Sequence, residues 1–541
     1  MRTNVFARSA LECGGKRSAT PPFLAASEGG VALRFPPHSK AAAPRNETRL
    51  MKMRQQLSLI LATAALLALA APLRAQMIVT YGFTPSATVP DNGQITDPRT
   101  LGGFASYSNV AVNLSLSSPT AGNPMFLADL YSTLTMGLPS ESERVAVLLN
   151  RPGRNDSNPF GSDLSSLNVT LDDSAVHPNI WGTTSSTGIY NSDGRLGVNP
   201  NGPGVAFQES DRTKPLSALN GAALPSNRFN LLVADTATGG IARLDGWGLN
   251  VTGSAAASGT MSASEGTMSI GDTGAAAANN LGATVVTTQP NGAAGTLVVN
   301  IAGTMTMSGG VSGTSGLTKQ GGGLLTINSA GTYAGATVVA ANGGTLEVGG
   351  ASGKLSGTTS IAVNTNGTLL LSGAGGTDTK LNNLAPVTLA GGTIDLDGMT
   401  SSLDQTVGAL TLSANSILDL GTLLAGNTWK FAPSNADWSS VQLNIFNYTG
   451  GADHLFFGTS TSGLDGSQLD RIMFFSDAGM NSLGTAQWSG GMGEITPVPE
   501  PATWAAGLLT VAALAYTQRR CRKRAASYSG RSTTRLPDRR S

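Results

Sequence analysis

The chain has 541 residues, including 69 Gly and 26 Pro, with a formal net charge of +1, 12% charged residues and 5% aromatic residues. Gly has no three-residue period, which excludes collagen, and Gly, Ser, Thr and Asn displace the residues that a helical bundle needs. The balanced charge carries no basic stripe that would indicate nucleic-acid binding. A large, loop-rich, mainly β protein is therefore expected.

Residues 51–75 have the three parts of a secretory signal peptide. A positive start at Met51 is followed by an apolar run over 57–71, and the small residue Ala75 stands at its exit. The run is too short for a membrane span, so we expect cleavage between Ala75 and Gln76.

Residues 1–50 are irregular and should not precede a signal peptide. We interpret them as a mis-assigned start, with translation beginning at Met51 or Met53. The alternative is a cytoplasmic extension before a signal anchor.

Residues 77–253 contain short runs in which apolar and polar residues alternate. The runs at 110–116, 145–149 and 167–171 predict half-buried strands. Turn clusters such as Pro152-Gly153 separate them, a pattern typical of a β-sandwich.

The same segment carries short motifs in a fixed order. They are Val89-Pro90-Asp91-Asn92-Gly93, Asp129-Leu130, Leu138-Pro139, Leu171-Asp172-Asp173, Pro215-Leu216, Leu231-Leu232-Val233-Ala234-Asp235 and Leu244-Asp245-Gly246-Trp247. In these motifs the segment resembles the P domain (Homo B domain), which accompanies proprotein convertases and many bacterial secreted proteins. The resemblance implies a β jelly roll over 77–253.

Residues 254–427 repeat a Gly-Thr-(Leu/Ile) start at intervals of about 20–27 residues, a spacing that fits the rungs of a parallel β-solenoid. The starts are Gly295-Thr296-Leu297, Gly344-Thr345-Leu346, Gly367-Thr368-Leu369 and Gly392-Thr393-Ile394, with Gly323-Leu324-Leu325 as a variant. Small apolar residues would stack inward, and Gly or Asn would form the corners.

The centre of this segment has a longer pattern. It comprises Gly316-Leu317-Thr318-Lys319, Gly323-Leu324-Leu325-Thr326-Ile327, Gly331-Thr332-Tyr333 and Gly344-Thr345-Leu346. This pattern resembles the autotransporter-associated β-strand repeat. The resemblance implies an elongated stalk at a bacterial surface.

Residues 428–496 are rich in aromatic residues, whereas Tyr333 is the only aromatic residue of the preceding segment. The aromatic residues of 428–496 are Trp429, Phe431, Trp438, Phe446, Tyr448, Phe456, Phe457, Phe474, Phe475 and Trp488. We expect this segment to be a capping module that closes the open end of the solenoid.

Residues 497–524 combine three features in order. The triplet Pro499-Glu500-Pro501 leads into an apolar stretch over 503–517, and a basic cluster follows, made of Arg519, Arg520, Arg522, Lys523 and Arg524. The stretch predicts one short transmembrane helix, and the basic cluster acts as a stop-transfer signal that keeps the C-terminus cytoplasmic.

These three features resemble the PEP-CTERM sorting signal of Gram-negative bacteria. The resemblance implies recognition by an exosortase, a membrane cysteine protease, and processing at or near Pro499-Glu500-Pro501. The basic tail 525–541 is a departure, because the family usually stops at its basic cluster. A plain single-pass anchor is the alternative interpretation.

The search for catalytic residues finds no convincing set. His177, which follows Asp172 and Asp173, and His454, beside Asp453, remain after signal removal. A surface histidine is the favoured interpretation of each, and no Gly-x-Ser-x-Gly motif supports a hydrolase. The two cysteines allow neither a disulfide framework nor a cysteine-based zinc site. We therefore expect no catalytic site.

The acidic residues are candidate ligands for calcium. Asp91, Asp129, Asp172, Asp173 and Asp235 could bind it in the P-like domain. Asp395 and Asp397 begin like a calcium loop but lack its final Glu, so solvation of a turn is the favoured interpretation. We expect no metal site and no cofactor, with calcium as the alternative.

Together these patterns predict a jelly-roll sandwich, a parallel β-solenoid and one short C-terminal transmembrane helix. The expected function is that of an exported structural or adhesive protein of the cell surface or exopolysaccharide matrix. Its processing partners would be signal peptidase and an exosortase, with a transient inner-membrane anchor before processing. The alternatives are an accessory or degenerate extracellular hydrolase, because P domains accompany subtilisin-like serine proteases, and a carbohydrate- or calcium-binding adhesin.

Overall fold

The computed structural model describes residues 76–529, apart from 121–124, 156, 162, 197–206, 263–265, 275–276, 288–295, 435 and 499–500. The structure contains 49% strand and 9% helix, which confirms the prediction of a mainly β protein. The expected signal peptide up to Ala75, the irregular residues before it, Pro499, Glu500 and residues 530–541 lie outside the described residues.

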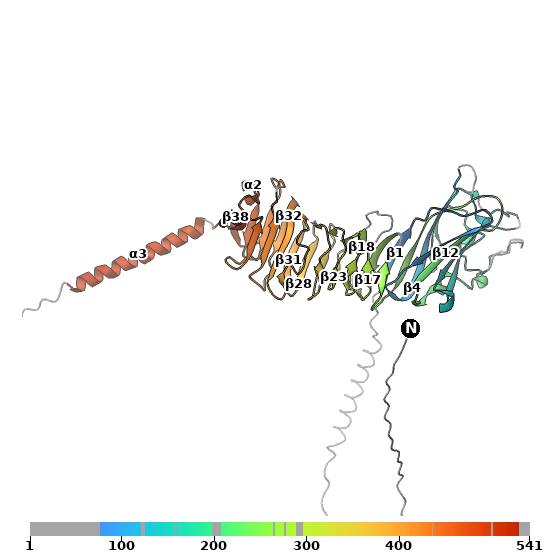
Figure 1. Cartoon of the computed structure of the whole chain (residues 1–541), viewed down its shortest axis with the longest axis horizontal. Helices are drawn as coiled ribbons and strands as arrows, with labels where there is room; N and C mark the ends of the chain where they lie inside the picture. The colour runs from blue at the N-terminus through green and yellow to red at the C-terminus, as the bar shows by residue number, and fades with distance from the viewer. Residues whose placement is uncertain are drawn as a thin grey trace, which may run out of the picture. The chain divides into compact units, whose positions relative to one another are not determined.

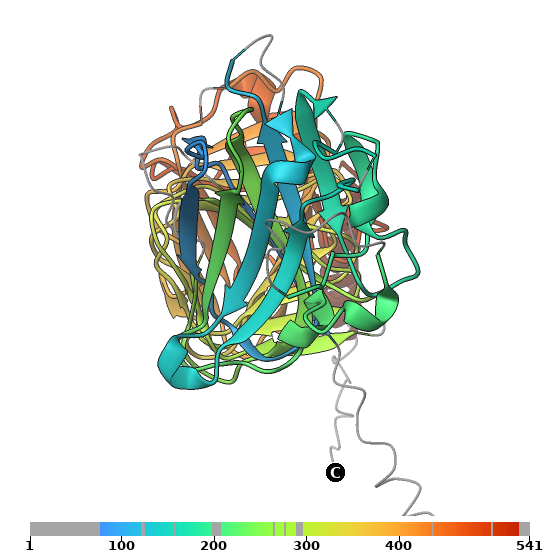
Figure 2. The same cartoon turned by 90° about the vertical axis from the view of Figure 1, so that its right-hand side faces the viewer.

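Residues 77–255 form two sheets whose neighbouring strands are antiparallel, except for the parallel pair β9 and β10 (Figures 1 and 2). The first sheet has the order β10 (Thr187–Tyr190), β9 (Ser166–Leu171), β4 (Phe104–Ser117), β13 (Arg243–Ala255) and β1 (Met77–Phe83). The second sheet has the order β3 (Gln94–Thr100), β12 (Arg228–Asp235), β6 (Leu130–Met136) and β7 (Arg144–Asn150).

The connections between these strands hold short elements. They are β2 (Ala87–Thr88), β5 (Met125–Phe126), β8 (Asp163–Leu164), β11 (Gly221–Ala222), and the 3-10 turns η1 (Leu127–Asp129), η2 (Pro139–Glu141), η3 (Ile180–Gly182), η4 (Glu209–Asp211) and η5 (Leu216–Leu219).

The core of this sandwich follows from the alternation of its strands. Every second residue of β1, from Met77 to Phe83, is buried. The Trp247 ring on β13 lies 4.9 Å from the Phe83 ring, and its Nε1 donates a hydrogen bond to the Asp97 carboxylate on β3 at 2.7 Å. A buried indole thus satisfies its polar atom across the two sheets.

Residues from 260 onward form a parallel β-solenoid of about 8 turns, which confirms this part of the prediction. Its first face contains β15 (Gly266–Asp272), β18 (Thr296–Asn300), β21 (Gly316–Gln320), β24 (Thr337–Val339), β27 (Ile361–Asn364), β30 (Val387–Ala390) and the second half of β32 (Leu403–Ala414).

The second face contains β16 (Ala278–Leu281), β19 (Thr304–Met307), β22 (Leu324–Ile327), β25 (Thr345–Val348), β28 (Thr368–Gly373), β31 (Thr393–Met399), β33 (Ser416–Asp419), β35 (Leu443–Phe446) and β37 (Ile472–Phe475). The third face contains one ladder of β14 (Thr260–Ser262), β17 (Thr284–Val286), β20 (Val311–Ser312), β23 (Ala330–Gly331) and β26 (Lys354–Leu355), and a second ladder of β29 (Gly376–Thr377), the first half of β32, β34 (Thr428–Ala432) and β36 (His454–Phe457).

The Gly-Thr starts mark where rungs of the second face begin. Thr345, Thr368 and Thr393 are register partners on β25, β28 and β31, and the following residue of each strand is buried. Stacking of equivalent inward residues gives the solenoid a continuous core. Thr296 differs, because it begins β18 of the first face.

The N-terminal end of the solenoid is covered by the sandwich. Strand β1 pairs antiparallel with β13 on one side and with β15 on the other, and β15 in turn pairs parallel with β18. The first sheet of the sandwich therefore continues into the first face of the solenoid, and that face has no free edge here.

At the C-terminal end the parallel ladder runs past residue 427, where the sequence had suggested a boundary. Strands β34 to β37 are still rungs, joined through the short helix α2 (Gly466–Leu469). The ladder ends in an antiparallel hairpin of β38 (Ser482–Trp488) and β39 (Glu494–Pro497), which pair with β37 and β36. The closing element is this hairpin, and the aromatic residues before it mostly fill the last rungs.

The expected transmembrane helix needs a correction. Helix α3 spans Pro501–Ser529 and covers the apolar stretch and the basic cluster. None of the helices in the described part of the chain is long and apolar enough to cross a membrane. The apolar stretch is shorter than the about 20 residues of a typical span, and Arg519 and Arg520 follow it directly in the same helix.

Candidate functional site

Three of the acidic residues singled out above meet at one end of the second sheet of the sandwich. Asp91 lies in the turn before β3, Asp129 ends η1 just before β6, and Asp235 is the last residue of β12. Because β12 lies between β3 and β6, with Ala234 opposite Gln94 and Asp235 opposite Leu130, the three carboxylates share one edge. We call Asp91, Asp129 and Asp235 the acidic trio.

Two members of the acidic trio, Asp129 and Asp235, are buried, whereas Asp91 is exposed, and the three carboxylates repel one another. Asp129 is 5% exposed and Asp235 is 3% exposed. Burial raises the pKa of Asp235 to about 6, and the negative charges of Asp129 and Asp91 act in the same direction. Burial also raises the pKa of Asp129, with the positive charge of Arg154 opposing the shift. The trio can therefore hold a proton at mildly acidic pH.

An aromatic pair stands beside the acidic trio. The rings of Phe126 and Phe160 lie 5.5 Å apart, and Phe160 is 59% exposed. Phe126 directly precedes η1, which ends at Asp129. Acceptors for hydroxyl hydrogen bonds and an exposed ring are thus available at the same end of the sandwich.

The acidic trio does not amount to a calcium site as it is arranged. The Asp91 carboxylate accepts a hydrogen bond from the Gly239 N–H at 3.2 Å, and the Asp235 carboxylate accepts one from the Ala237 N–H at 3.3 Å. Among the residues that the structure describes, no group of three or more His, Cys, Asp or Glu could hold a metal ion. The calcium alternative therefore gains no support from this geometry.

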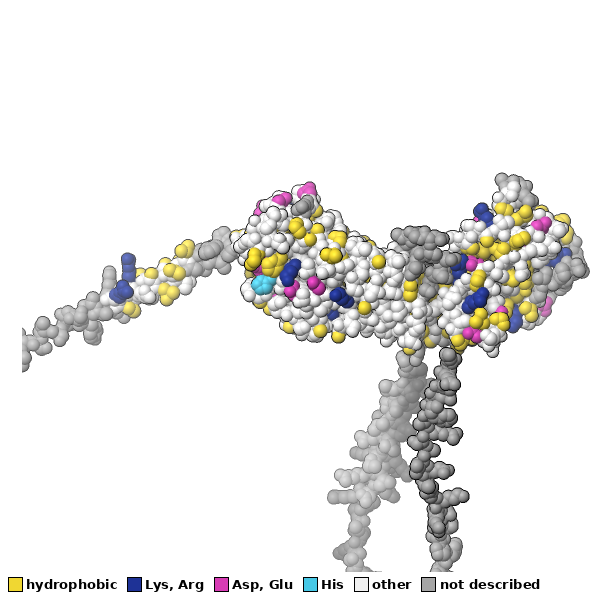
Figure 3. All heavy atoms as spheres, in the orientation of Figure 1, with side chains coloured by type: hydrophobic (Ala, Val, Ile, Leu, Met, Phe, Trp, Pro, Cys, Tyr) yellow, Lys and Arg dark blue, Asp and Glu magenta, His cyan; other side chains and the backbone are white. Residues whose placement is uncertain are grey.

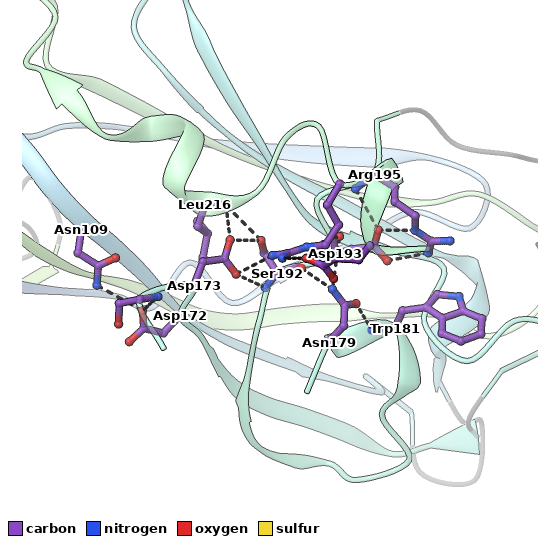
Figure 4. Close-up of polar contacts among 12 residues, drawn as sticks. Asn109, Asp172, Asp173, Asn179, Trp181, Ser192, Asp193, Arg195 and Leu216 are labelled. Carbon is purple, nitrogen blue, oxygen red and sulfur yellow. Dashed lines mark hydrogen bonds and ion pairs between the residues drawn. The ribbon is translucent and has the colours of Figure 1, made fainter. Parts of the chain in front are cut away.

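Asp173, which the sequence grouped with the acidic trio, belongs to a separate polar network (Figure 4). Its carboxylate accepts hydrogen bonds from the Ser192 N–H at 2.8 Å and the Leu216 N–H at 2.6 Å, and it pairs with Arg212 at 3.0 Å. These bonds tie the β9–β10 connection to three points of the β10–β11 connection, which is a structural role.

The same network continues to Asp193 and Arg195. Fully buried Asp193 accepts two hydrogen bonds of 2.8 Å from the Arg195 guanidinium, which lies over the rings of Trp181 and Phe207 at 5.7 and 5.2 Å. Arg195 is thereby held by charge on one side and by aromatic rings on the other.

The two histidines do not form the His–Asp dyads considered above. The Asp172 carboxylate accepts hydrogen bonds from Asn109 and from the Ser174 N–H, and no hydrogen bond joins it to His177. His454 Nδ1 lies 2.6 Å from a carboxylate oxygen of Glu494.

The carboxylates of Asp453, Asp395 and Asp397 hold turns of the solenoid. Asp453 accepts hydrogen bonds from the N–H groups of Asn427 and Thr449. Asp395 accepts one from the Asp397 N–H, and Asp397 accepts one from the Thr422 N–H. Asp395 and Asp397 thus hydrogen-bond to backbone N–H groups of turns, as aspartates at turns commonly do.

Sequence reasoning missed two buried lysines in the solenoid. Lys319 is fully buried on β21, and its Nζ donates hydrogen bonds of 2.8 Å to the carbonyls of Gln320, Gly321 and Gly343. Burial lowers the pKa of Lys319 to about 8, and the charge of Asp272 opposes the shift. Lys380 is 1% exposed and donates to the Gly350 carbonyl at 2.8 Å.

The buried position of Lys319 could have been predicted from the alternation of its strand. In the strand Leu317-Thr318-Lys319 it occupies an inward position of the alternating pattern, where an apolar residue is the rule.

Comparison of the chain with protein-family models, with curated protein sequences and with solved structures found no match in any of the three. The class of molecule therefore rests on the fold: an antiparallel two-sheet domain whose first sheet continues into a parallel β-solenoid.

The raised pKa of Asp235 predicts a pH dependence of stability. Between about pH 4 and about 6 the folded chain binds a proton that the unfolded chain has released, so this group makes the protein less stable as the pH rises through about 6. We expect Asp235→Asn to raise the free energy of unfolding near pH 7 by about 2 kcal/mol and to have a smaller effect near pH 4.

Urea unfolding at about pH 4.5 and about pH 7.5 measures this difference. Exposed Asp211→Asn is the matched control and should leave the pH dependence of the parent chain unchanged. An equal gain from Asp235→Asn at both pH values would contradict the prediction.

Proposed function

We propose that this protein is an exported structural or adhesive protein of the cell surface or exopolysaccharide matrix of a Gram-negative bacterium. The observation that carries the proposal is a parallel solenoid of about 8 turns whose ladder is covered at one end by β1 and at the other by the β38–β39 hairpin. Covered edges prevent the solenoids of two chains from pairing end to end, which is expected of a monomeric stalk.

In this proposal the sandwich is a P domain-like jelly roll carried by the stalk. Few charged side chains lie over the middle of the solenoid on the face shown in Figure 3. This sparsely charged surface supports the proposed location of the stalk in a hydrated polysaccharide matrix. The hydrolase alternative gains no support, since neither histidine is paired with its neighbouring aspartate.

The position of the Pro-Glu-Pro triplet supports the sorting part of the proposal. Strand β39 ends at Pro497, the Val498 N–H donates a hydrogen bond to the Thr485 carbonyl at 2.7 Å, and α3 begins at Pro501. The triplet thus follows the closing hairpin of the solenoid, and its last residue, Pro501, is the first residue of α3. Cleavage by an exosortase at this point would remove the C-terminal segment without cutting the solenoid.

Replacing Pro499, Glu500 and Pro501 by Ala is expected to leave an unprocessed protein that keeps its C-terminal segment, while its signal peptide is still removed. Prolines disfavour helix, whereas alanines would favour extension of α3 towards the hairpin and so hinder access by a protease. Mass spectrometry of both mature ends, in a host that has an exosortase, measures the outcome.

The matched control replaces Ser532, Thr533 and Thr534 by Ala, which changes three residues of the tail and should leave processing intact. Parent protein recovered from the cell surface with residues 525–541 still attached would show that the C-terminal segment is not removed and would contradict the sorting part of the proposal.

A further inference from the structure

A polar groove crosses three successive turns at the C-terminal end of the second face of the solenoid. Its volume is about 300 Å³, and its lining comes from the turn after β33, the turn after β35 and the turn after β37. The lining combines the polar side chains of Thr422, Asn447, Thr449 and Ser476 with the apolar side chains of Leu423, Leu424 and Ala425. This volume is at the lower end of the about 300–1,000 Å³ usual for ligand sites.

Carboxylates fix the walls of the groove. In the turn after β33, Asp397 accepts hydrogen bonds from the Thr422 N–H at 2.6 Å and the Thr422 hydroxyl at 2.9 Å. Asp419 accepts hydrogen bonds from the Gly421 N–H at 2.9 Å and the Asn447 side chain at 2.6 Å, which joins the first turn to the second.

The other two turns are fixed in the same way. Asp453 accepts hydrogen bonds from the Gly426 N–H at 2.8 Å and the Thr449 N–H at 2.7 Å, so one carboxylate serves two turns. In the turn after β37, Asp477 accepts hydrogen bonds from the N–H groups of Met480 and Asn481 at 2.8 and 3.0 Å. A groove built in this way is pre-organised and loses little conformational freedom on binding.

The groups left for a ligand are hydroxyls and an amide. Thr449 and Ser476 are exposed, and their hydroxyls can both donate and accept hydrogen bonds, whereas the Asn447 carboxamide oxygen can accept them. The lining contains no charged side chain, and the nearby carboxylates of Asp397 and Asp419 disfavour an anion.

An aromatic pair outside the lining directly precedes two of the lining residues in the sequence. Phe446 and Phe475 end β35 and β37, directly before Asn447 and Ser476, and their half-buried rings lie 5.3 Å apart on the outward side of the second face. Such rings can pack against the apolar face of a ring-shaped polar ligand.

From the polar lining, the fixed turns and the aromatic pair, we propose that this groove binds a segment of a neutral polysaccharide. The turns it crosses are about 4.8 Å apart, the spacing of adjacent strands, so successive units of an extended chain meet successive turns. The inference rests on the proposed matrix function and names the ligand class through which the stalk would contact its matrix.

The test is calorimetric titration of the chain, purified from an exporting host, with neutral hexose oligosaccharides of the cellulose, mannan and dextran types. Oligogalacturonate serves as the anionic probe. We expect binding to at least one neutral probe and no tighter binding of the anionic one. The double variant Thr449→Ala/Ser476→Ala should weaken binding about tenfold, because two hydrogen bonds are lost.

The matched control is Thr411→Ala/Ser413→Ala, which removes two exposed hydroxyls of β32 outside the groove and should leave affinity unchanged. Absence of binding to every neutral probe, preference for oligogalacturonate, or equal affinity of parent and groove variant would each overturn the proposal. The result is separable from the proposed function, because processing at the Pro-Glu-Pro triplet is read from the mature C-terminus and does not depend on the groove.

Discussion

Replacing Lys319 by Met is expected to lower the free energy of unfolding by about 3 kcal/mol. Its ammonium group is the buried donor to three carbonyls, those of Gln320, Gly321 and Gly343, each at 2.8 Å. Methionine has a similar volume, so the loss comes from unpaired carbonyls and not from a cavity. Urea unfolding followed by circular dichroism measures the difference.

Lys354→Met is the matched control for this prediction. Lys354 is half-buried and donates one hydrogen bond, to the Asp378 carbonyl at 2.7 Å. Water can replace that donor, so we expect a loss below about 1 kcal/mol. Equal losses for the two variants would mean that the buried ammonium of Lys319 has no special role in holding its corner.

Ending the chain after Asn481, and so removing the β38–β39 hairpin, is expected to convert a monomer into aggregates. The hairpin supplies the antiparallel partners of β36 and β37, and without it both strands present unpaired N–H and C=O groups. Size-exclusion chromatography with light scattering reports the change in mass, and a melting curve reports the loss of stability.

A second variant separates edge pairing from the loss of exposed apolar surface. Met492 lies between β38 and β39 and is 76% exposed. Replacing it by Ser keeps the pairing and should leave the chain monomeric. A truncated chain that stays monomeric with an unchanged melting curve would show that the hairpin does not close the ladder.

The cap at the C-terminal end of the solenoid could be predicted only in part from the sequence. The need for a cap follows from any parallel ladder, and the aromatic residues after Trp429 pointed to its region. The sequence could not show that β34 to β37 continue the ladder, because a rung and a cap strand of this length have similar composition. Which neighbour pairs with which strand depends on contacts distant in the chain.

The sequence by itself determined the mainly β class and the solenoid rungs. Alternation along strands such as β1 and the Gly-Thr starts at Thr345, Thr368 and Thr393 are local signals, because a β-strand turns every second side chain to the same face. The same alternation marks Lys319 as an inward residue, although a lysine is not expected there.

Only the tertiary structure decided which residues of separate strands meet. It brought Asp91, Asp129 and Asp235 to one edge while placing Asp173 in another network, and it joined three turns into the groove that contains Thr449 and Ser476. It also paired β1 with both β13 and β15, which links the sandwich to the solenoid. These outcomes depend on register between segments far apart in sequence, and local periodicity carries no information about register of that kind.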